Sequence, residues 1–356
     1  MATKAAARAC GERVLAAFAA AGAQEIAPDI LQPAEVLLDL YGEDIRARAY
    51  VTSDPARGEM MLRPDFTVPV VQAHMAGGAE PARYCYMGEV FRKQDHLGAA
   101  RVAEYIQAGY EVFDRADPEA ADAEAFALIA AQVAHLGLTA TIGDIGILRA
   151  AVEGLDTIPA RKQALARHIW RPQRFHKLMA RYAGLELAPA TRAALLSGLR
   201  PGAPWIGLRS PDEMEARIAR LRLDATAAPI PAEDVARLDA LFALRCPAPE
   251  APARLRALGL PAIEGAIARL ERRLNALAAR EVALETLGFD ASHGRTTMEY
   301  YDGFVFALSA TDPALPPVAS GGRYDALTRV LGGGSAIPAV GGVIRPGLVA
   351  DLEGAQ

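Results

Sequence analysis

The spacing of apolar and polar positions predicts extended structure between residues 58 and 114. From Gly58 to Asp114, apolar and aromatic residues recur close to every second position, as they do in strands. Three strand candidates stand there: GEMMLRP at 58–64, ARYCYMGEVFR at 82–92 and EYIQAGYEVFD at 104–114. The polar segment RKQDHLGAARVA joins the last two. The pattern therefore predicts a long hairpin with a charged tip.

Helical patterns flank this extended part. Residues 118–136 have helical spacing, and TATIGDIGILRA then predicts a further strand with a polar step at Asp144. At the N-terminus, MATKAAARACGERVLAAFAAAG predicts an amphipathic helix, because Arg13 interrupts the apolar run that a signal peptide needs. The segment AQEIAPDILQPAEVLLDLYGEDI predicts a short extended entry, turns at Pro28 and Pro33, and a short helix.

Residues 159–278 have a different character. They are rich in Ala, Leu and Arg at helical spacing, and breaks that contain proline interrupt them. Strand patterns return in EYYDGFVFALSA, PPVASGGRYDALTRVLGG and IPAVGGVIRPGLVADL. Strands before and after a helical stretch predict an α+β fold. We expect a sheet domain made of residues 1–158 and 279–356, with a helical insertion at 159–278.

The amino-acid composition argues against nucleic acid and membranes as partners. Of the 356 residues, 52% are hydrophobic and 23% are charged, and the formal net charge is −5. This balance is typical of a folded globular protein and provides no strongly basic surface for nucleic acid. No apolar run reaches the roughly 18 residues of a spanning helix, so we expect no membrane segment.

Cysteines and histidines do not form metal-ligand patterns. Cys10, Cys85 and Cys246 are far apart and odd in number, so we expect neither a disulfide framework nor a zinc site. The six histidines are scattered, and His96 and His293 are expected to be solvated loop residues. These features predict a cytoplasmic protein without a metal or another cofactor.

Polar residues that could bind an amino acid gather in strand and turn segments. Gln107 and Glu111 are four positions apart in one strand candidate, so alternation places them on one face. Carboxylates bind ammonium groups and arginine binds carboxylates, so such a set could hold a zwitterion. Taken alone, each residue is more often a solvated strand or turn residue. The candidates are Asp65, Thr67, Arg92, Gln107, Glu111, Arg295, Tyr300 and Tyr301.

The order of motifs resembles the catalytic domain of histidyl-tRNA synthetase, a class II aminoacyl-tRNA synthetase, over almost the whole chain. The motifs are LRPDFT, RYCYMGEVFR, EYIQAGYEVF, EYYDG, GGRYDAL and PAVGG. The resemblance implies an antiparallel sheet flanked by helices. It also implies that Phe91 and Arg92 match the FR pair that contacts a nucleotide phosphate. The GGRYD turn at 321–325 is interpreted as structural rather than phosphate-binding.

The same resemblance implies a histidine-binding pocket. Its matching residues are Asp65, Thr67, Gln107, Glu111, Tyr300 and Tyr301. Arg295 is the candidate for the arginine of the family's RGLDYY stretch, although RTTMEYY is one residue longer here.

The third motif departs from the synthetases. The family reads like PAVGFAMGLERL, whereas this chain reads PAVGGVIRPGLV. In ungapped register Leu348 stands in place of the arginine that holds ATP, Gly347 in place of the glutamate, and Pro346 just before them. Arg345 lies three positions early. Without that arginine the phosphates lose charge stabilisation, so we expect adenylation to be lost. The chain ends at Gln356, and we expect no anticodon-binding domain and no tRNA partner.

This combination resembles the regulatory subunits of ATP phosphoribosyltransferase. The resemblance implies a subunit without catalysis of its own, which a short-form catalytic subunit requires for activity in the first step of L-histidine biosynthesis. It implies a hetero-octamer with a homodimer core formed around Pro28, and feedback inhibition by L-histidine as allosteric effector. Two alternatives stay open: a truncated histidine-activating ligase, and a free-standing amino-acid-binding protein.

Overall fold

The computed structural model describes residues 2–35, 49–93, 102–187, 189–198, 210–295 and 300–355. Within them, nine strands form one mixed sheet in the order β1-β5-β6-β12-β11-β10-β7-β9-β8. In that order the strands are β1 (Gln24–Glu25), β5 (Ala82–Phe91), β6 (Glu104–Phe113), β12 (Ala339–Ile344), β11 (Ala319–Arg323), β10 (Phe304–Ser309), β7 (Thr139–Asp144), β9 (Gly288–Asp290) and β8 (Arg245–Pro247). The central pairs are antiparallel, and β1–β5 and β7–β9 are parallel. A second sheet has the order β2 (Leu31–Pro33), β4 (Gly58–Leu62), β3 (Val51–Asp54).

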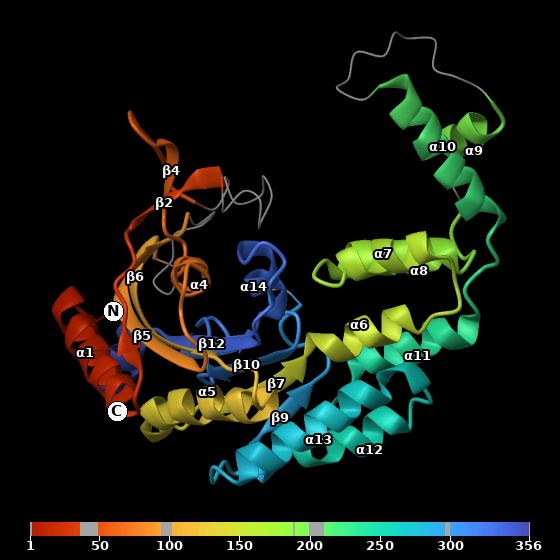
Figure 1. Cartoon of the computed structure of the whole chain (residues 1–356). Coiled ribbons are helices and arrows are strands. Elements are labelled where there is room, and N and C mark those ends of the chain that lie inside the picture. Colours follow the sequence, from red (N-terminus) through yellow and green to blue (C-terminus); the bar gives the residue numbers. More distant parts are fainter. Residues whose placement is uncertain are drawn as a thin grey trace.

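Helices cover both faces of the large sheet (Figure 1). On the face that carries Tyr110 lie α1 (Lys4–Ala20), α5 (Pro118–Val133) and α15 (Pro346–Glu353), whereas α4 (Thr67–Met75) and α14 (Asp325–Leu331) lie together on the opposite side. Residues with short polar side chains cap the N-termini of α1 and α5. Thr3 accepts a hydrogen bond from the backbone N–H of Ala6, and Asp117 accepts one from the backbone N–H of Ala120.

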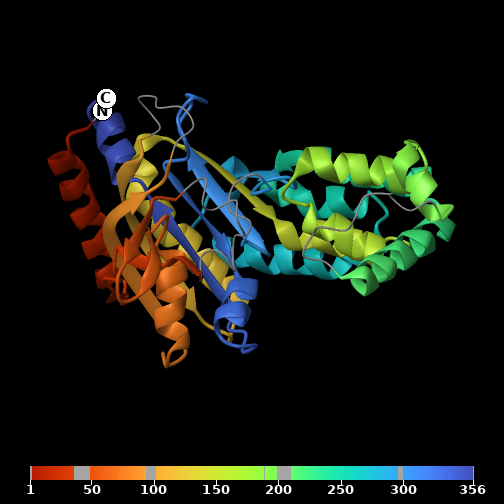
Figure 2. The ribbon, with the colours of Figure 1, turned by 90° about the horizontal axis from the view of Figure 1, so that it is seen from above.

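The remaining helices extend to one side of the sheet, as Figure 2 shows from above. They are α6 (Ile145–Glu153), α7 (Pro159–Arg167), α8 (Pro172–Tyr182), α9 (Ala190–Leu196), α10 (Pro211–Thr226), α11 (Ala232–Ala243), α12 (Ala251–Arg256) and α13 (Glu264–Ala278). Short 3-10 turns occur at Ala134–Leu136, Ala248–Glu250, Pro261–Ile263 and Leu284–Thr286. None of the described helices is both long and apolar enough to span a membrane.

The fold class predicted from the motifs is confirmed, and the hairpin is the best-predicted part. Strands β5 and β6 pair from Ala82 with Phe113 to Phe91 with Glu104. The strand predicted for TATIGDIGILRA is wrong in its second half. It ends at Asp144, whose carboxylate accepts a hydrogen bond from the backbone N–H of Gly146 and begins α6. A capping carboxylate explains the polar step better than a strand does.

Two other predictions fall mainly on residues outside the described ranges. The tip of the hairpin, with His96, and most of the short helix expected after Pro33 lie outside them. The division at residues 159 and 278 stays a prediction. Strand β8 and helix α13 come from that interval, yet β8 pairs with β9 of the sheet and α13 packs on α5.

A buried ion network joins α13 to the sheet. The guanidinium of Arg273 is 2% exposed and bonds to Asp122 on α5 at 2.7 Å and to Asp144 at the end of β7 at 2.9 Å. Arg323, at the end of β11, bonds to the other oxygen of Asp122 and to Asp325. Each buried charge therefore has an opposite charge as its partner, which offsets the cost of removing it from water.

We expect Arg273→Ala to lower the free energy of unfolding by about 3–5 kcal/mol, because it leaves Asp122 and Asp144 buried without their shared cation. Urea unfolding measures the change. The neighbouring Arg272→Ala is the matched control: Arg272 also binds a carboxylate, Glu119, but is 58% exposed, so its loss should cost less than about 1 kcal/mol. Equal effects of the two variants would contradict this account.

Candidate functional site

A buried carboxylate, Glu111, is the centre of the candidate site. It lies on β6, is 1% exposed, and accepts hydrogen bonds from three hydroxyl groups. The donors are Tyr324 at 2.6 Å, Tyr86 at 2.8 Å and Thr67 at 3.2 Å. They come from the β11–α14 connection, strand β5 and the start of α4. Segments that are far apart in the sequence therefore meet at one carboxylate.

Two glycines make room for this arrangement. Gly341 on β12 pairs directly with Glu111, and a Cβ atom at that position would lie 1.5 Å from Oε2 of Glu111. Gly109 lies beneath the ring of Tyr86, and a Cβ there would come within 2.4 Å of it. The glycines of PAVGG and IQAGY are thus required by the packing of the site.

The carboxyl group of Glu111 is poised to titrate near neutral pH. Burial raises its pKa to about 7, and the hydroxyls of Tyr324, Tyr86 and Thr67 oppose that shift by stabilising the carboxylate. The groups that act most strongly on its pKa include no Lys or Arg of the described part of the chain. A cationic ligand would supply the missing positive charge and favour the ionised form.

The other acidic and hydroxyl candidates lie close by. Thr67 is the first residue of α4, and the hydroxyl of Tyr300 lies 3.5 Å from its Oγ1. Asp65 is 4% exposed and accepts a hydrogen bond from the N–H of Val68 at 3.4 Å. Tyr301 is buried, and burial followed by the charges of Glu111 and Asp65 raises its pKa. The structure therefore brings Asp65, Thr67, Glu111, Tyr300 and Tyr301 together, and their role in binding a ligand stays a prediction.

Gln107 shares the face of β6 with Glu111. It is 2% exposed, and its Oε1 has no hydrogen-bond partner within the described ranges. A buried amide oxygen without a donor is costly, and in a binding site it marks a position for a ligand N–H or O–H group.

The two predicted arginines have different surroundings. Arg92 follows β5, and its Nε donates to the carbonyl of Pro64 at 2.7 Å, one residue before Asp65. Arg295 donates from Nε to the carbonyl of Ile169 and lies over the ring of Phe242 at 4.2 Å. The prediction that Arg295 joins the pocket finds no support in these contacts, which are with the helical region.

Tyr86 and Tyr324 were missed by the sequence reasoning. Alternation along RYCYMGEVF places Tyr86 opposite Gly109, on the face of Glu111, and that signal was available. Tyr324 belongs to GGRYD, which was interpreted as structural, and Arg323 of that turn is indeed held in ion pairs with Asp122 and Asp325. His293, expected to be solvated, is instead half-buried, and burial lowers its pKa.

The third motif forms a strand followed by a short helix. Pro346 is the first residue of α15, where its missing N–H costs nothing, and Leu348 packs against the hydrophobic core. In the part of the chain that the structure describes, no cluster of His, Cys, Asp or Glu has the arrangement of a metal site.

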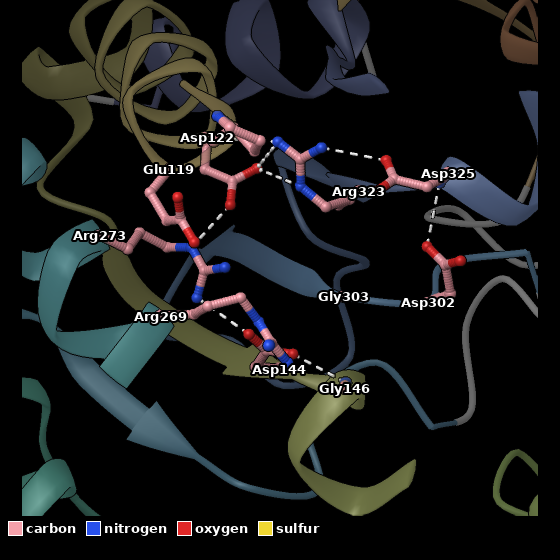
Figure 3. A pocket seen from close by; sticks show the side chains of 11 residues that line it. Glu119, Asp122, Asp144, Gly146, Arg269, Arg273, Asp302, Gly303, Arg323 and Asp325 are labelled. Carbon is pink, nitrogen blue, oxygen red and sulfur yellow. Dashed lines mark hydrogen bonds and ion pairs between the residues drawn. The ribbon is translucent and has the colours of Figure 1, made fainter. Parts of the chain in front are cut away.

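A cavity of about 270 Å³ lies around the buried ion network (Figure 3). Five carboxylates and three arginines are among its lining residues, and Arg273 and Arg323 already bind Asp122, Asp144 and Asp325. The lining is thus largely self-neutralised. The Glu111 cluster, made of Asp65, Thr67, Tyr86, Gln107, Glu111, Tyr300, Tyr301 and Tyr324, is therefore the better candidate, because within the described ranges Glu111 lacks a cationic partner and Oε1 of Gln107 lacks a donor.

Comparison with known proteins identifies the class. A sequence model of the histidyl-tRNA synthetase family matches residues 2–202 and 213–346. A solved structure of an ATP phosphoribosyltransferase regulatory subunit/histidyl-tRNA synthetase from Bacillus halodurans has a TM-score of 0.69 and 21% identity, over 99% of this chain and 81% of that one. A histidine–tRNA ligase subunit from Alicyclobacillus acidocaldarius has a TM-score of 0.61 and 22% identity, over 98% and 93%. The fold is that of the class II histidyl-tRNA synthetases.

Proteins related in sequence define the family within this class. The ATP phosphoribosyltransferase regulatory subunit of Agrobacterium fabrum is 35% identical over 92% of both chains. That of Mesorhizobium japonicum is 31% identical over 91% of this chain and 92% of its own. The chain belongs to the family of ATP phosphoribosyltransferase regulatory subunits.

The raised pKa of Glu111 predicts a pH dependence of stability. Between its ordinary value of 4.5 and about 7, the folded protein keeps a proton that the unfolded chain has released. The contribution of this group to the free energy of unfolding therefore falls as pH rises, by about 3 kcal/mol over that interval. Urea unfolding at pH 5 and pH 7.5 measures it. Glu111→Gln should remove the fall, whereas Glu104→Gln, an exposed glutamate of the same strand, should keep it.

Proposed function

We propose that this chain is a non-catalytic regulatory subunit of ATP phosphoribosyltransferase that binds L-histidine in the Glu111 cluster. The observation that carries the assignment is its 35% identity, over 92% of both chains, to a protein of that name. The cluster adds a physical reason for an amino-acid ligand. Glu111 and Asp65 offer buried negative charge, and Gln107 offers an unpaired acceptor.

The partner in this proposal is the short-form catalytic subunit. That subunit converts ATP and phosphoribosyl pyrophosphate to phosphoribosyl-ATP and pyrophosphate, the first step of L-histidine biosynthesis, and requires the regulatory chain for activity. The proposed assembly is a cytoplasmic hetero-octamer with a homodimer core at the region around Pro28. In this structure the carbonyl of Pro28 accepts a hydrogen bond from Nη1 of Arg63 at 2.6 Å, which fixes that region to the end of β4.

Histidine acts in this proposal as a signal rather than as a substrate. An effector shifts an assembly only by the difference between its affinities for two states. The hydroxyls that hold Glu111 come from α4, β5 and the β11–α14 connection, so a ligand that bonds to Glu111 changes contacts of all three segments together. In the proposal, this change in contacts alters the surface of the histidine-bound chain that faces the catalytic subunit.

Loss of adenylation is part of the proposal. Leu348 occupies the position that the synthetase motif gives to an ATP-binding arginine, and its side chain packs against the core. Pro346 begins α15 directly before it. A leucine offers no charge to a triphosphate, so the electrostatic stabilisation that phosphoryl or adenylyl transfer needs is absent at this position.

The direct test measures phosphoribosyl-ATP formation by the short catalytic subunit with and without this chain, across a histidine titration. We expect activation by the chain and reversal by histidine, because the ligand favours the inhibited assembly. Histidine-dependent ATP–pyrophosphate exchange by the chain alone is measured in parallel. Exchange without activation would instead support a truncated histidine-activating ligase. Histidine binding without any effect on the transferase would support a free-standing amino-acid-binding protein.

We expect Glu111→Gln to weaken histidine binding roughly 10- to 150-fold, the range for losing a hydrogen bond to a charged group. Glutamine keeps the size of the side chain and can still bond to Tyr86 and Tyr324, so the change removes mainly the charge. Titration calorimetry gives the dissociation constants. Glu104→Gln on the same strand is the matched control and should bind normally. Unchanged affinity in Glu111→Gln would exclude this pocket.

A further inference from the structure

Arg345 lies on the sheet face that carries the candidate pocket. Strand β12 ends at Ile344, which pairs with Ala108 of β6. The backbone of Arg345 is still extended, with φ −104° and ψ 91°, so the alternation of the strand continues through it. Arg345 therefore stands one position beyond that pair, beside Gln107, on the same face as Gly341 and Glu111.

Arg345 interacts with the hydroxyl group of Tyr105 but forms no ion pair with a carboxylate of the described ranges. Its guanidinium lies 5.7 Å from the ring centroid of Tyr105, two residues before Gln107 on the same face of β6. Burial lowers its pKa, and the nearby charge of Arg92 lowers it further. Two other buried arginines, Arg273 and Arg323, bind aspartates, whereas Arg63 donates to backbone carbonyls. A bound anion would stabilise a half-buried guanidinium that lies near a second one.

The neighbouring amide oxygen indicates what kind of anion fits. Oε1 of Gln107 is buried and accepts no hydrogen bond from a described residue. A ligand that satisfies both positions must present a donor to Gln107 and an oxyanion to Arg345. The α-ammonium and α-carboxylate of an amino acid are such a pair on one carbon atom. An inorganic phosphate ion supplies the oxyanion but no comparable cationic donor.

We infer that Arg345, together with Arg92, binds the α-carboxylate of the amino acid whose ammonium group faces Gln107. This inference rests on the proposed function and names a binding residue for the same pocket. It replaces Arg295 in that role, because Arg295 donates to Ile169 and lies over Phe242 of the helical region. The ligand class that follows is an amino acid with a free carboxylate.

The test compares L-histidine with histamine, which lacks the carboxylate, by titration calorimetry on the full chain. The wild type should bind histidine at least tenfold more tightly than histamine. Arg345→Gln should lower histidine affinity tenfold or more and change histamine affinity less than about twofold. Arg345→Lys, which keeps a positive charge without the forked donor geometry, should give an intermediate ratio. Arg329→Gln, an exposed arginine on α14, is the matched control and should behave as wild type.

Each outcome decides the inference. A wild type that binds histamine as well as histidine would overturn the inference, and so would an unchanged ratio of the two affinities in Arg345→Gln. Binding of inorganic phosphate that Arg345→Gln abolishes, with histidine affinity unchanged, would assign Arg345 to a phosphate and overturn it as well. Failure of the wild type to bind either imidazole ligand would refute the proposed function itself, which separates the two failures.

Discussion

The burial of Glu111 is the constraint on which the site and much of the sheet depend. A carboxylate at 1% exposure needs hydrogen bonds from every side, and three hydroxyl groups supply them. Those hydroxyls in turn fix where α4 begins, how Tyr86 lies on β6 and how β11 turns into α14. The glycines opposite and beside Glu111 exist because no side chain fits between these groups. The two carboxylate oxygens of Glu111 thus connect several elements that are distant in the sequence.

The two polar centres of the fold differ in how they are satisfied. Around Arg273, positive and negative side chains neutralise one another, and the result joins α13 to α5 and to the end of β7. In the pocket, Glu111 has no positively charged partner and Oε1 of Gln107 has no donor within the described part of the protein. The first arrangement is complete without a ligand and suits a structural role. The second is incomplete in a way that a zwitterion completes.

Local patterns predict the parts of this structure that depend on neighbours in sequence. Period-two spacing gives the β5–β6 hairpin and places Gln107 and Glu111 on one face. The sequence pattern gives Asp144 as a polar position within a strand, because an aspartate that caps a helix cannot be told from one in a strand without the structure. Arg295 was expected in the pocket, but its position depends on Phe242 and Ile169, which lie in the helical region far along the chain. Tyr324 likewise becomes a partner of Glu111 only through the tertiary arrangement of the sheet.

Gly341 shows how control by a ligand could be lost without changing any atom that touches the ligand. A single methyl group there would occupy the space of Oε2 of Glu111 and force the carboxyl group out of its position. The same methyl group would also lie 2.7 Å from the backbone carbonyl of Tyr110 on β6, so the paired strands would have to shift there, although the composition of the surface would stay the same. If histidine is the effector that we propose, genetic screens for strains that overproduce histidine would recover substitutions at this glycine, in subunits that activate the enzyme but do not respond to its end product.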